Sequence, residues 1–218
     1  MEFIDLSHNI YDGLITYKGL PAPIICDFWE REKTAGNYDD GSTFQIGKIE
    51  MVANTGTYMD CPFHRYADGH DLAGLLLEHC ANLETLVIDA PFEKNIEVGL
   101  PFFENKKVTG KAVLINTGWS KFFGTELYST QHPYLTEEAA IFLRDNGAKL
   151  VGIDSNNIDD TRYRTRPVHT ILLRENILIV EHMAHLDKLP KNKKMFFTAV
   201  PPKIKGMGTF PVRAFVSL

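Results

Sequence analysis

The feature that most constrains the fold of this chain is that short apolar runs outnumber helical patterns. Eight runs have the length and spacing of β-strands, at residues 3–6, 44–53, 85–88, 112–116, 149–153, 177–180, 196–200 and 212–216. A doubly wound sheet would place a helix between most successive strands, and this chain has too few helical patterns for that. We therefore predict an α/β fold in which mixed sheets form a barrel-like β layer flanked by a few helices.

Two segments have the features of helices. Thr136 is a suitable N-cap for the stronger one, two glutamates follow it in the first turn, and Gly147 suits a left-handed C-terminal cap. We expect its buried face to contain Ala139, Ala140 and Leu143. A shorter helix is predicted after Asp71, with the four leucines between positions 72 and 77 on its buried side. A break in the alternation at Gly47–Lys48 indicates a β-bulge in the strand at 44–53.

The composition is that of an ordinary globular protein. The chain has 218 residues, of which 44% are hydrophobic and 23% charged, and no linker divides it, so we predict one domain spanning residues 1–218. A net charge of -5 with mixed signs argues against nucleic-acid binding. No apolar run approaches the length of a membrane helix, and the acidic start does not have the pattern of a signal peptide. We expect a cytoplasmic protein that does not bind membranes.

Polar side chains follow three of the predicted strands. Asn54, Tyr58, Asp60 and His64 come after the strand at 44–53, in what we expect to be a loop. Asp154 begins a polar segment after the next such strand, and a third follows the strand at 177–180. Because α/β folds place their sites just beyond strand ends, the three clusters together predict a functional site.

Asp60 and His64 form the first candidate pair. They lie four residues apart in a segment stiffened by Pro62, and a carboxylate with an imidazole suits Zn²⁺ or Mn²⁺. Taken alone, the pair is better explained by an aspartate that accepts hydrogen bonds in a turn and a histidine on the surface.

Glu181 is the second candidate. It follows the apolar run I-L-I-V, and a carboxylate at the end of a buried strand is seldom left unpaired because its desolvation is costly. A metal ion, an arginine or a proton would satisfy it. His169 precedes this strand and a short intervening segment would bring the two together, whereas Arg162, Arg166 and Arg174 are alternative salt-bridge partners.

These residues lie within motifs that resemble the cyclase-like metal-dependent hydrolases, which include bacterial kynurenine formamidases (arylformamidases) and isatin hydrolases. The similar stretches run nearly end to end and in the same order. They are D-L-S-H-N-I-Y-D-G-L at 5–14, N-T-G-T-Y-M-D-C-P-F-H at 54–64, I-N-T-G-W at 115–119, H-P-Y-L at 132–135, V-G-I-D-S at 151–155, V-H-T-I-L-L at 168–173 and I-V-E-H-M at 179–183.

The resemblance implies a swivelling β/β/α fold, a homo-oligomer (dimer or tetramer), and hydrolysis of an amide, N-formyl or lactam bond in a small-molecule substrate. Formamidase members carry the loop His-x-Gly-Thr-His-x-Asp-x-Pro-x-His and bind two metal ions. By this resemblance Asp60, His169 and Glu181 would be metal ligands and His64 a catalytic acid/base.

The chain departs from that loop at two positions, where Asn54 and Tyr58 replace histidines. Neither side chain is a good zinc ligand at neutral pH, so we predict one divalent ion, Zn²⁺ or Mn²⁺, in place of two. The predicted substrate-binding residues are Tyr17, Asn54, Tyr58, Phe63 and Trp119. For Trp119, a place in the core is an equal alternative.

The leading hypothesis is a metal-dependent amidohydrolase that uses metal-activated water. The two lost histidines motivate an alternative, in which the chain is a small-molecule-binding protein on a degenerate hydrolase scaffold. A lactone hydrolase or a cyclase on the same metal site is a third possibility that the sequence does not separate from the first.

Overall fold

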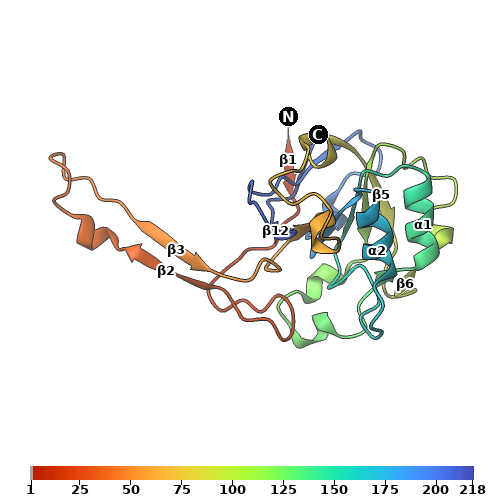
Figure 1. Cartoon of the computed structure of the whole chain (residues 1–218), viewed down its shortest axis with the longest axis horizontal. Helices are drawn as coiled ribbons and strands as arrows, with labels where there is room; N and C mark the ends of the chain where they lie inside the picture. The colour runs from red at the N-terminus through yellow and green to blue at the C-terminus, as the bar shows by residue number, and fades with distance from the viewer. Residues whose placement is uncertain (1) are drawn as a thin grey trace.

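The computed structural model describes residues 2–218 and shows a body with a long hairpin arm (Figure 1). The body is a mixed sheet with helices on one face, and the arm projects from it. The two chain ends lie close together on the body, because the first and last strands pair with each other.

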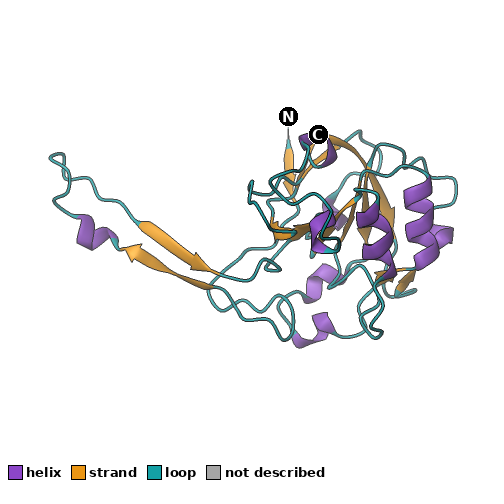
Figure 2. Cartoon of the chain, in the orientation of Figure 1, coloured by secondary structure: helices purple, strands orange, loops and turns teal. Residues whose placement is uncertain are grey.

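The secondary structure is mainly short strands (Figure 2). The strands are β1 (Phe3–Asp5), β2 (Ile24–Trp29), β3 (Ile46–Glu50), β4 (Tyr58–Asp60), β5 (Leu83–Asp89), β6 (Glu97–Val98), β7 (Ala112–Asn116), β8 (Tyr134–Leu135), β9 (Leu150–Ile153), β10 (Leu178–Glu181), β11 (Phe196–Thr198), β12 (Thr209–Pro211) and β13 (Phe215–Ser217). The α-helices are α1 (Glu137–Asp145) and α2 (Pro167–Arg174). The 3₁₀ turns are Arg31–Thr34, Pro62–His64, Leu77–His79, Leu100–Phe102, Trp119–Phe122, Glu126–Ser129 and Leu186–Lys188.

A curled nine-stranded sheet forms the body, in the order β1-β13-β11-β5-β7-β9-β10-β4-β12. The four central strands β5, β7, β9 and β10 are parallel, and the strands on both sides of them are antiparallel. This is the mixed α/β sheet with few helices that the sequence predicts, so the predicted fold class is confirmed.

Alternating side chains of the central strands form two hydrophobic cores, one on each face of the sheet. Val113, Val151 and Ile179 point toward α1 and α2, whereas Leu114 and Leu150 point to the opposite face. Period-2 alternation of this kind follows from strand geometry. Because both of their faces are covered, β9 and β10 are fully buried, and they give the site a rigid platform.

The predicted helix after Thr136 is confirmed as α1. The Thr136 hydroxyl accepts a hydrogen bond from the Ala139 backbone N–H, and Gly147 has a φ of +72° in the terminating turn. The predicted helix after Asp71 is wrong, because the chain there forms turns and Leu76 and Leu77 are exposed. The Asp71 carboxylate accepts hydrogen bonds from the backbone N–H groups of Gly74 and Gly206, which stabilise a turn.

The predicted strands are recovered with shifted ends, but the sequence missed β2, β4, β12 and the helix α2. Tyr58 to Asp60 belongs to β4, so this part of the predicted loop at 54–68 is wrong. The strand predicted at 44–53 is only β3, and its five residues are exposed. The register shift lies in β2, between Asp27, which pairs with Gly47, and Trp29. The irregularity is therefore in β2 and not in the strand where the sequence predicts the bulge.

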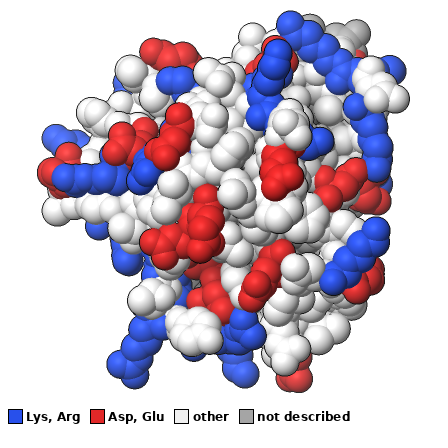
Figure 3. Space-filling view, turned by 90° about the vertical axis from the view of Figure 1, so that its right-hand side faces the viewer, with Lys and Arg blue, Asp and Glu red and all other residues white. Residues whose placement is uncertain are grey.

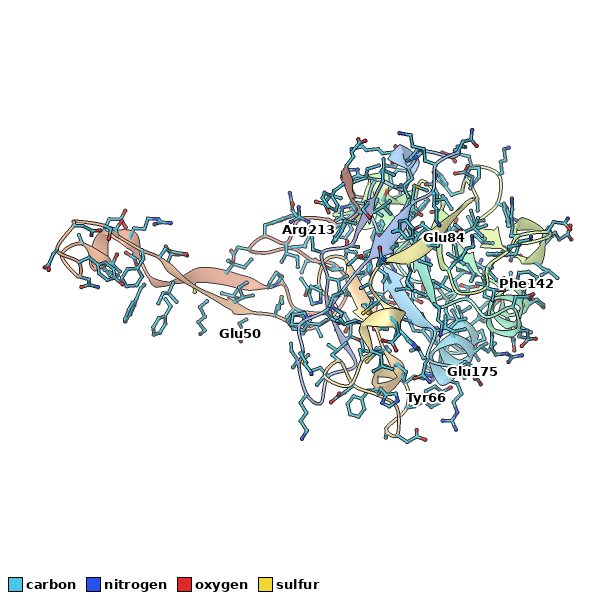
Figure 4. The ribbon with its side chains drawn as sticks, turned by 90° about the horizontal axis from the view of Figure 1, so that it is seen from above. Glu50, Tyr66, Glu84, Phe142, Glu175 and Arg213 are labelled. Atoms are coloured by element: carbon cyan, nitrogen blue, oxygen red, sulfur yellow. The ribbon has the colours of Figure 1, made fainter. Side chains whose placement is uncertain are left out.

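Strands β2 and β3 form the arm, which we define as residues 24–50. It is a two-stranded antiparallel ribbon separate from the main sheet. Figure 4 shows its side chains projecting away from the body, with Glu50 at the end of β3 nearest the body. Exposed apolar side chains run along it, at Ile24, Phe28, Trp29, Tyr38, Ile46 and Ile49.

Surface charge is mixed. On the face shown in Figure 3, acidic side chains lie near the middle and basic ones toward the edges. Within residues 2–218, no helix is long and apolar enough to cross a membrane.

Candidate metal and active site

A pocket of about 330 Å³ lies where β4, β10 and α2 meet. The antiparallel register of β4 with β10 sets Tyr58 directly opposite Glu181. Because side chains two residues apart on a strand share a face, Asp60 lies on that same face. The pocket is lined by Tyr17, Lys18, Gly19, Leu20, Asn54, Tyr58, Asp60, His64, Asn157, His169 and Glu181.

Asp60 is the carboxylate at the centre of this arrangement and is only 1% exposed. Its Oδ1 accepts a hydrogen bond from the Thr209 hydroxyl, and its Oδ2 is buried with no hydrogen-bond partner among residues 2–218. Burial raises the pKa of this carboxyl, but contacts with His169 and His64 outweigh burial and hold the pKa below its usual value. Asp60 is therefore a carboxylate with one oxygen free to bind a cation.

His169 is held on α2 by the carboxylate of Asp159. Its Nδ1 lies 2.6 Å from Asp159 Oδ2, which fixes the proton on Nδ1. Its Nε2 lies 3.5 Å from Asp60 Oδ2 and 3.6 Å from Glu181 Oε1. Burial lowers the pKa of His169, but the surrounding carboxylates raise it to about 10. Three carboxylates around one imidazole favour a positive charge at Nε2, carried by a proton or by a metal ion.

Glu181 ends β10 and is 1% exposed. Its Oε2 accepts a hydrogen bond from the Tyr58 hydroxyl at 2.6 Å, and its Oε1 accepts one from the Ile158 backbone N–H at 2.6 Å. Burial raises the pKa of Glu181 to about 7, against the opposing effect of His169. No arginine forms a salt bridge with Glu181 among the described residues, so the arginine alternative is wrong.

His64 lies at the open side of the pocket, at the end of the 3₁₀ turn Pro62–His64. Its Nδ1 is 2.8 Å from the Thr209 hydroxyl and 3.5 Å from Asp60 Oδ1. Since that hydroxyl donates to Asp60, His64 Nδ1 must donate to it, which leaves Nε2 with a free lone pair. A Cβ on Gly208 would come within 2.2 Å of the His64 backbone nitrogen, so glycine is needed for this close approach.

Asn54 and Tyr58, the two departures from the family loop, both line the pocket. Burial and the Glu181 charge hold the pKa of Tyr58 well above its usual value, so its phenol is neutral and acts as a hydrogen-bond donor. In this arrangement Tyr58 donates its hydroxyl proton to Glu181.

The predicted aromatic substrate residues do not all meet. Tyr17 lines the pocket, whereas Phe63 and Trp119 do not. Trp119 is 5% exposed and packs edge-on against Phe92 and Phe122, with its indole N–H donating to the Tyr128 carbonyl. Trp119 therefore lies in the core, which is the alternative that the sequence left open, and it does not line this pocket.

Residues 4–160 match the family model described as putative cyclase, which is more than half of the chain. The chain belongs to the cyclase family. Sequence relatives agree with this assignment. The kynurenine formamidase of Erythrobacter litoralis is 31% identical over 168 residues, covering 76% of this chain and 74% of the relative. The kynurenine formamidase of Bacillus cereus is 26% identical over 218 residues, covering 99% of this chain and 97% of the relative.

Solved structures show the same fold for this cyclase-family chain. An isatin hydrolase bound to the product analogue thioisatinate has a TM-score of 0.81 at 22% identity, covering 99% of this chain and 91% of that one. A potential metal-dependent hydrolase with cyclase activity has a TM-score of 0.79 at 23% identity, covering 99% and 96%. Together with the family match and the sequence relatives, these likenesses identify the chain as a hydrolytic enzyme.

The donor atoms of this cyclase-family site fit a divalent ion. Ligands of a tetrahedral ion at about 2.1 Å lie about 3.4 Å apart, close to the separations of His169 Nε2 from Asp60 and from Glu181. Asp60, His64 and His169 form a compact group, with donor atoms within 4.8 Å of one another. Glu181 is outside that group. Asp60 and His169 are thus common to both possible ligand sets.

Sequence reasoning missed three residues that shape this site. Asp159 orients His169, Thr209 links His64 to Asp60, and Lys18 adds a cation to the pocket wall. Asp159 and Thr209 belong to no motif that carried the resemblance, and only the fold brings them to the site. The rule that metal-binding histidines use their second nitrogen on a carboxylate would have favoured a search for an Asp near His169.

Proposed function

We propose that the chain is a metal-dependent hydrolase that cleaves an amide, N-formyl or lactam C–N bond of a small molecule, as an arylformamidase does. The observation that carries this proposal is the buried Oδ2 of Asp60, which has no hydrogen-bond partner among residues 2–218 and lies 3.5 Å from Nε2 of His169. An unpaired buried carboxylate oxygen is costly unless a cation or a proton satisfies it. The names of the relatives, two of which are kynurenine formamidases, support the class of bond.

Asp60, His169 and Glu181 would hold one ion, Zn²⁺ or Mn²⁺, because Nε2 of His169 lies 3.5 Å from Asp60 Oδ2 and 3.6 Å from Glu181 Oε1 at the pocket wall. The ion would supply a water of lowered pKa, from ~15.7 toward ~7, and a Lewis acid for the carbonyl oxygen. The protein's part is to hold these ligands in fixed orientation, through Asp159 on His169 and Tyr58 on Glu181.

His64 moves the proton in this proposal. Thr209 fixes its tautomer with the hydrogen on Nδ1, so Nε2 can accept a proton from water and later deliver it to the leaving nitrogen. The side chain is 36% exposed, which allows exchange with solvent. Tyr17 and Asn54 would contact the substrate from the pocket wall, and Tyr58 lies deeper. Phe63 and Trp119 do not line the pocket and are left out of the proposed contacts.

Turnover of a panel of N-formyl anilines, lactams and lactones tests the function, with Asp60→Ala and Glu181→Ala as inactive partners. We expect metal-dependent hydrolysis of at least one formamide or lactam by the wild type and loss of this activity in both variants. Equal activity of wild type and variants overturns the proposal. Thermal stabilisation by panel compounds without any turnover would favour a binding protein instead, and turnover of lactones alone would favour a lactone hydrolase.

We also propose that the chain forms a homo-oligomer, a dimer or tetramer, through the arm. A two-stranded ribbon is at best marginally stable in water, and this one exposes Phe28 at 64% and Ile49 at 57%. The arm has about the 20–30 residues that one side of a standard interface contributes. We propose a second copy of the chain as the partner, because in a symmetric dimer each arm would cover the same apolar surface on the other copy.

Sedimentation of the wild type and of the double variant Phe28→Ser with Ile49→Ser tests the arm contact. Tyr163→Ser is the control, because Tyr163 is 65% exposed on the body. We expect an oligomer for the wild type and the control and a monomer for the arm variant. A monomeric wild type at micromolar concentration contradicts the proposed contact.

A further inference from the structure

A row of buried polar side chains lies behind the pocket, on the side away from His64. The Tyr128 hydroxyl is 3.1 Å from His182 Nδ1, and His182 Nε2 is 3.3 Å from the Tyr58 hydroxyl. The Tyr58 hydroxyl is in turn 2.6 Å from Glu181 Oε2. All four residues are at most 2% exposed, so solvent does not interrupt the row.

The direction of each hydrogen bond in this row is set by Glu181, which stands at one end of it. Both oxygens of Glu181 accept hydrogen bonds, Oε1 from the Ile158 backbone N–H and Oε2 from the Tyr58 hydroxyl, so the single proton of that hydroxyl points to Oε2. The Tyr58 oxygen is then an acceptor for His182, which requires a hydrogen on Nε2. A neutral ring has no hydrogen on Nδ1, which therefore accepts from Tyr128.

The opposite tautomer leaves groups unpaired. With the hydrogen on Nδ1, His182 Nε2 would face a Tyr58 oxygen that has already donated its proton, and the Tyr128 proton would lose its acceptor. Leaving buried polar groups without partners destabilises the folded protein. A protonated ring would also carry a hydrogen on Nδ1, so the Tyr128 proton would again lose its acceptor. The row therefore has one satisfied arrangement.

We propose that Tyr58 and His182 are positioning residues that hold Oε2 of Glu181 through this one-directional row, so that Oε1, which also accepts from the Ile158 backbone N–H, is the oxygen that faces an ion beside His169. This inference rests on the proposed metal site. It gives Tyr58 a specific role: its hydroxyl donates to Oε2, a buried oxygen that would otherwise have no hydrogen-bond donor. The site then holds one ion per chain, with Glu181 oriented by hydrogen bonds.

The row also explains how a neutral tyrosine fits beside the buried carboxylates of the site. Tyr58 packs beside His182 with ring centroids 5.0 Å apart, and the register of β4 with β10 places its hydroxyl at Glu181. Removing the hydroxyl would leave Oε2 buried without a donor. It would also leave His182 Nε2–H without an acceptor, so both the orientation of Glu181 and the tautomer of His182 would change.

The tautomer can be read directly by ¹⁵N NMR of the histidine rings in the metal-free wild type. We expect the hydrogen of His182 on Nε2 and a bare Nδ1, and a clear change of the ring signals in Tyr58→Phe. A wild-type His182 with its hydrogen on Nδ1 overturns the proposal. The wild-type measurement needs neither a bound ion nor a variant, so it tests the hydrogen-bond row independently of the proposed function.

Metal affinity tests the positioning role. Loss of an outer hydrogen-bond partner typically weakens metal binding about 10–100-fold, and we expect this loss in Tyr58→Phe by chelator competition. Tyr134→Phe is the matched control, because the Tyr134 hydroxyl donates to Glu97 Oε1 at 2.7 Å, outside this pocket. Wild-type affinity in a folded Tyr58→Phe overturns the positioning role. A wild type that binds no ion overturns the proposed metal site instead, while the tautomer result stands.

Discussion

The Nδ1 atom of His169 lies 2.6 Å from Oδ2 of Asp159, and the same carboxylate accepts hydrogen bonds from the backbone N–H groups of Val168 and His169. Asp159 thus binds the first turn of α2 and the ring of His169 at once. A carboxylate on the second nitrogen is the usual partner of a metal-binding histidine, since it fixes the ring and its tautomer. The arrangement orients Nε2 toward Asp60 and Glu181.

Replacing Asp159 with Asn should weaken metal binding about 10–100-fold, because the amide removes the charge that holds the His169 ring. Chelator competition on the purified variant measures this loss. Asp160→Asn is the neighbouring control, since Asp160 binds Arg162 and not the site. A variant at position 159 that binds as tightly as wild type would show that the carboxylate serves only the helix.

Replacing His64 with Gln separates its two possible roles. As the acid/base it should lower kcat about 10²–10⁴-fold while metal content stays at the wild-type level. As a third ligand in the group with Asp60 and His169, its loss should remove the ion as well. Metal analysis and steady-state kinetics on the same sample distinguish these results. We expect the first, and loss of metal would transfer His64 to the ligand set.

Acid should destabilise the fold partly through His8. Burial, with a smaller effect from His185, lowers the pKa of His8 to about 4 from the usual 6.5. The folded state therefore binds fewer protons than the unfolded state between these values. The contribution of neutral His8 is fully present above about pH 6.5 and is lost as the pH falls toward 4. Urea unfolding at several pH values should show a shallower loss for His8→Gln, and an unchanged slope would exclude this role.

Local signals account for what the sequence predicted well. Thr136 and Gly147 mark the ends of α1 through capping, and the central strands are apolar because both their faces are covered. Segments stabilised by distant contacts were missed or misplaced. Tyr58 to Asp60 forms a strand because β10 and β12 pair with it, which the surrounding glycine and proline obscure. The apolar residues of the arm imitate a core strand, although the body does not cover them.

For the site, the residue types in the motifs predicted the chemistry, whereas only the fold shows which distant residues contact them. Asp60, His64, His169 and Glu181 were predicted from motifs, and the structure places all four around one pocket. Their roles stay predictions. Asp159 and Thr209 were out of reach, because their contacts with His169 and Asp60 join segments with no shared local pattern.

The metal content of protein purified without chelators tests the central claim most directly. Elemental analysis of the wild type should give about one divalent ion per chain, and Asp60→Asn, which keeps the shape of the buried side chain, should give close to none. A wild type with no ion, or an Asp60→Asn variant with full occupancy, would contradict the metal site described here.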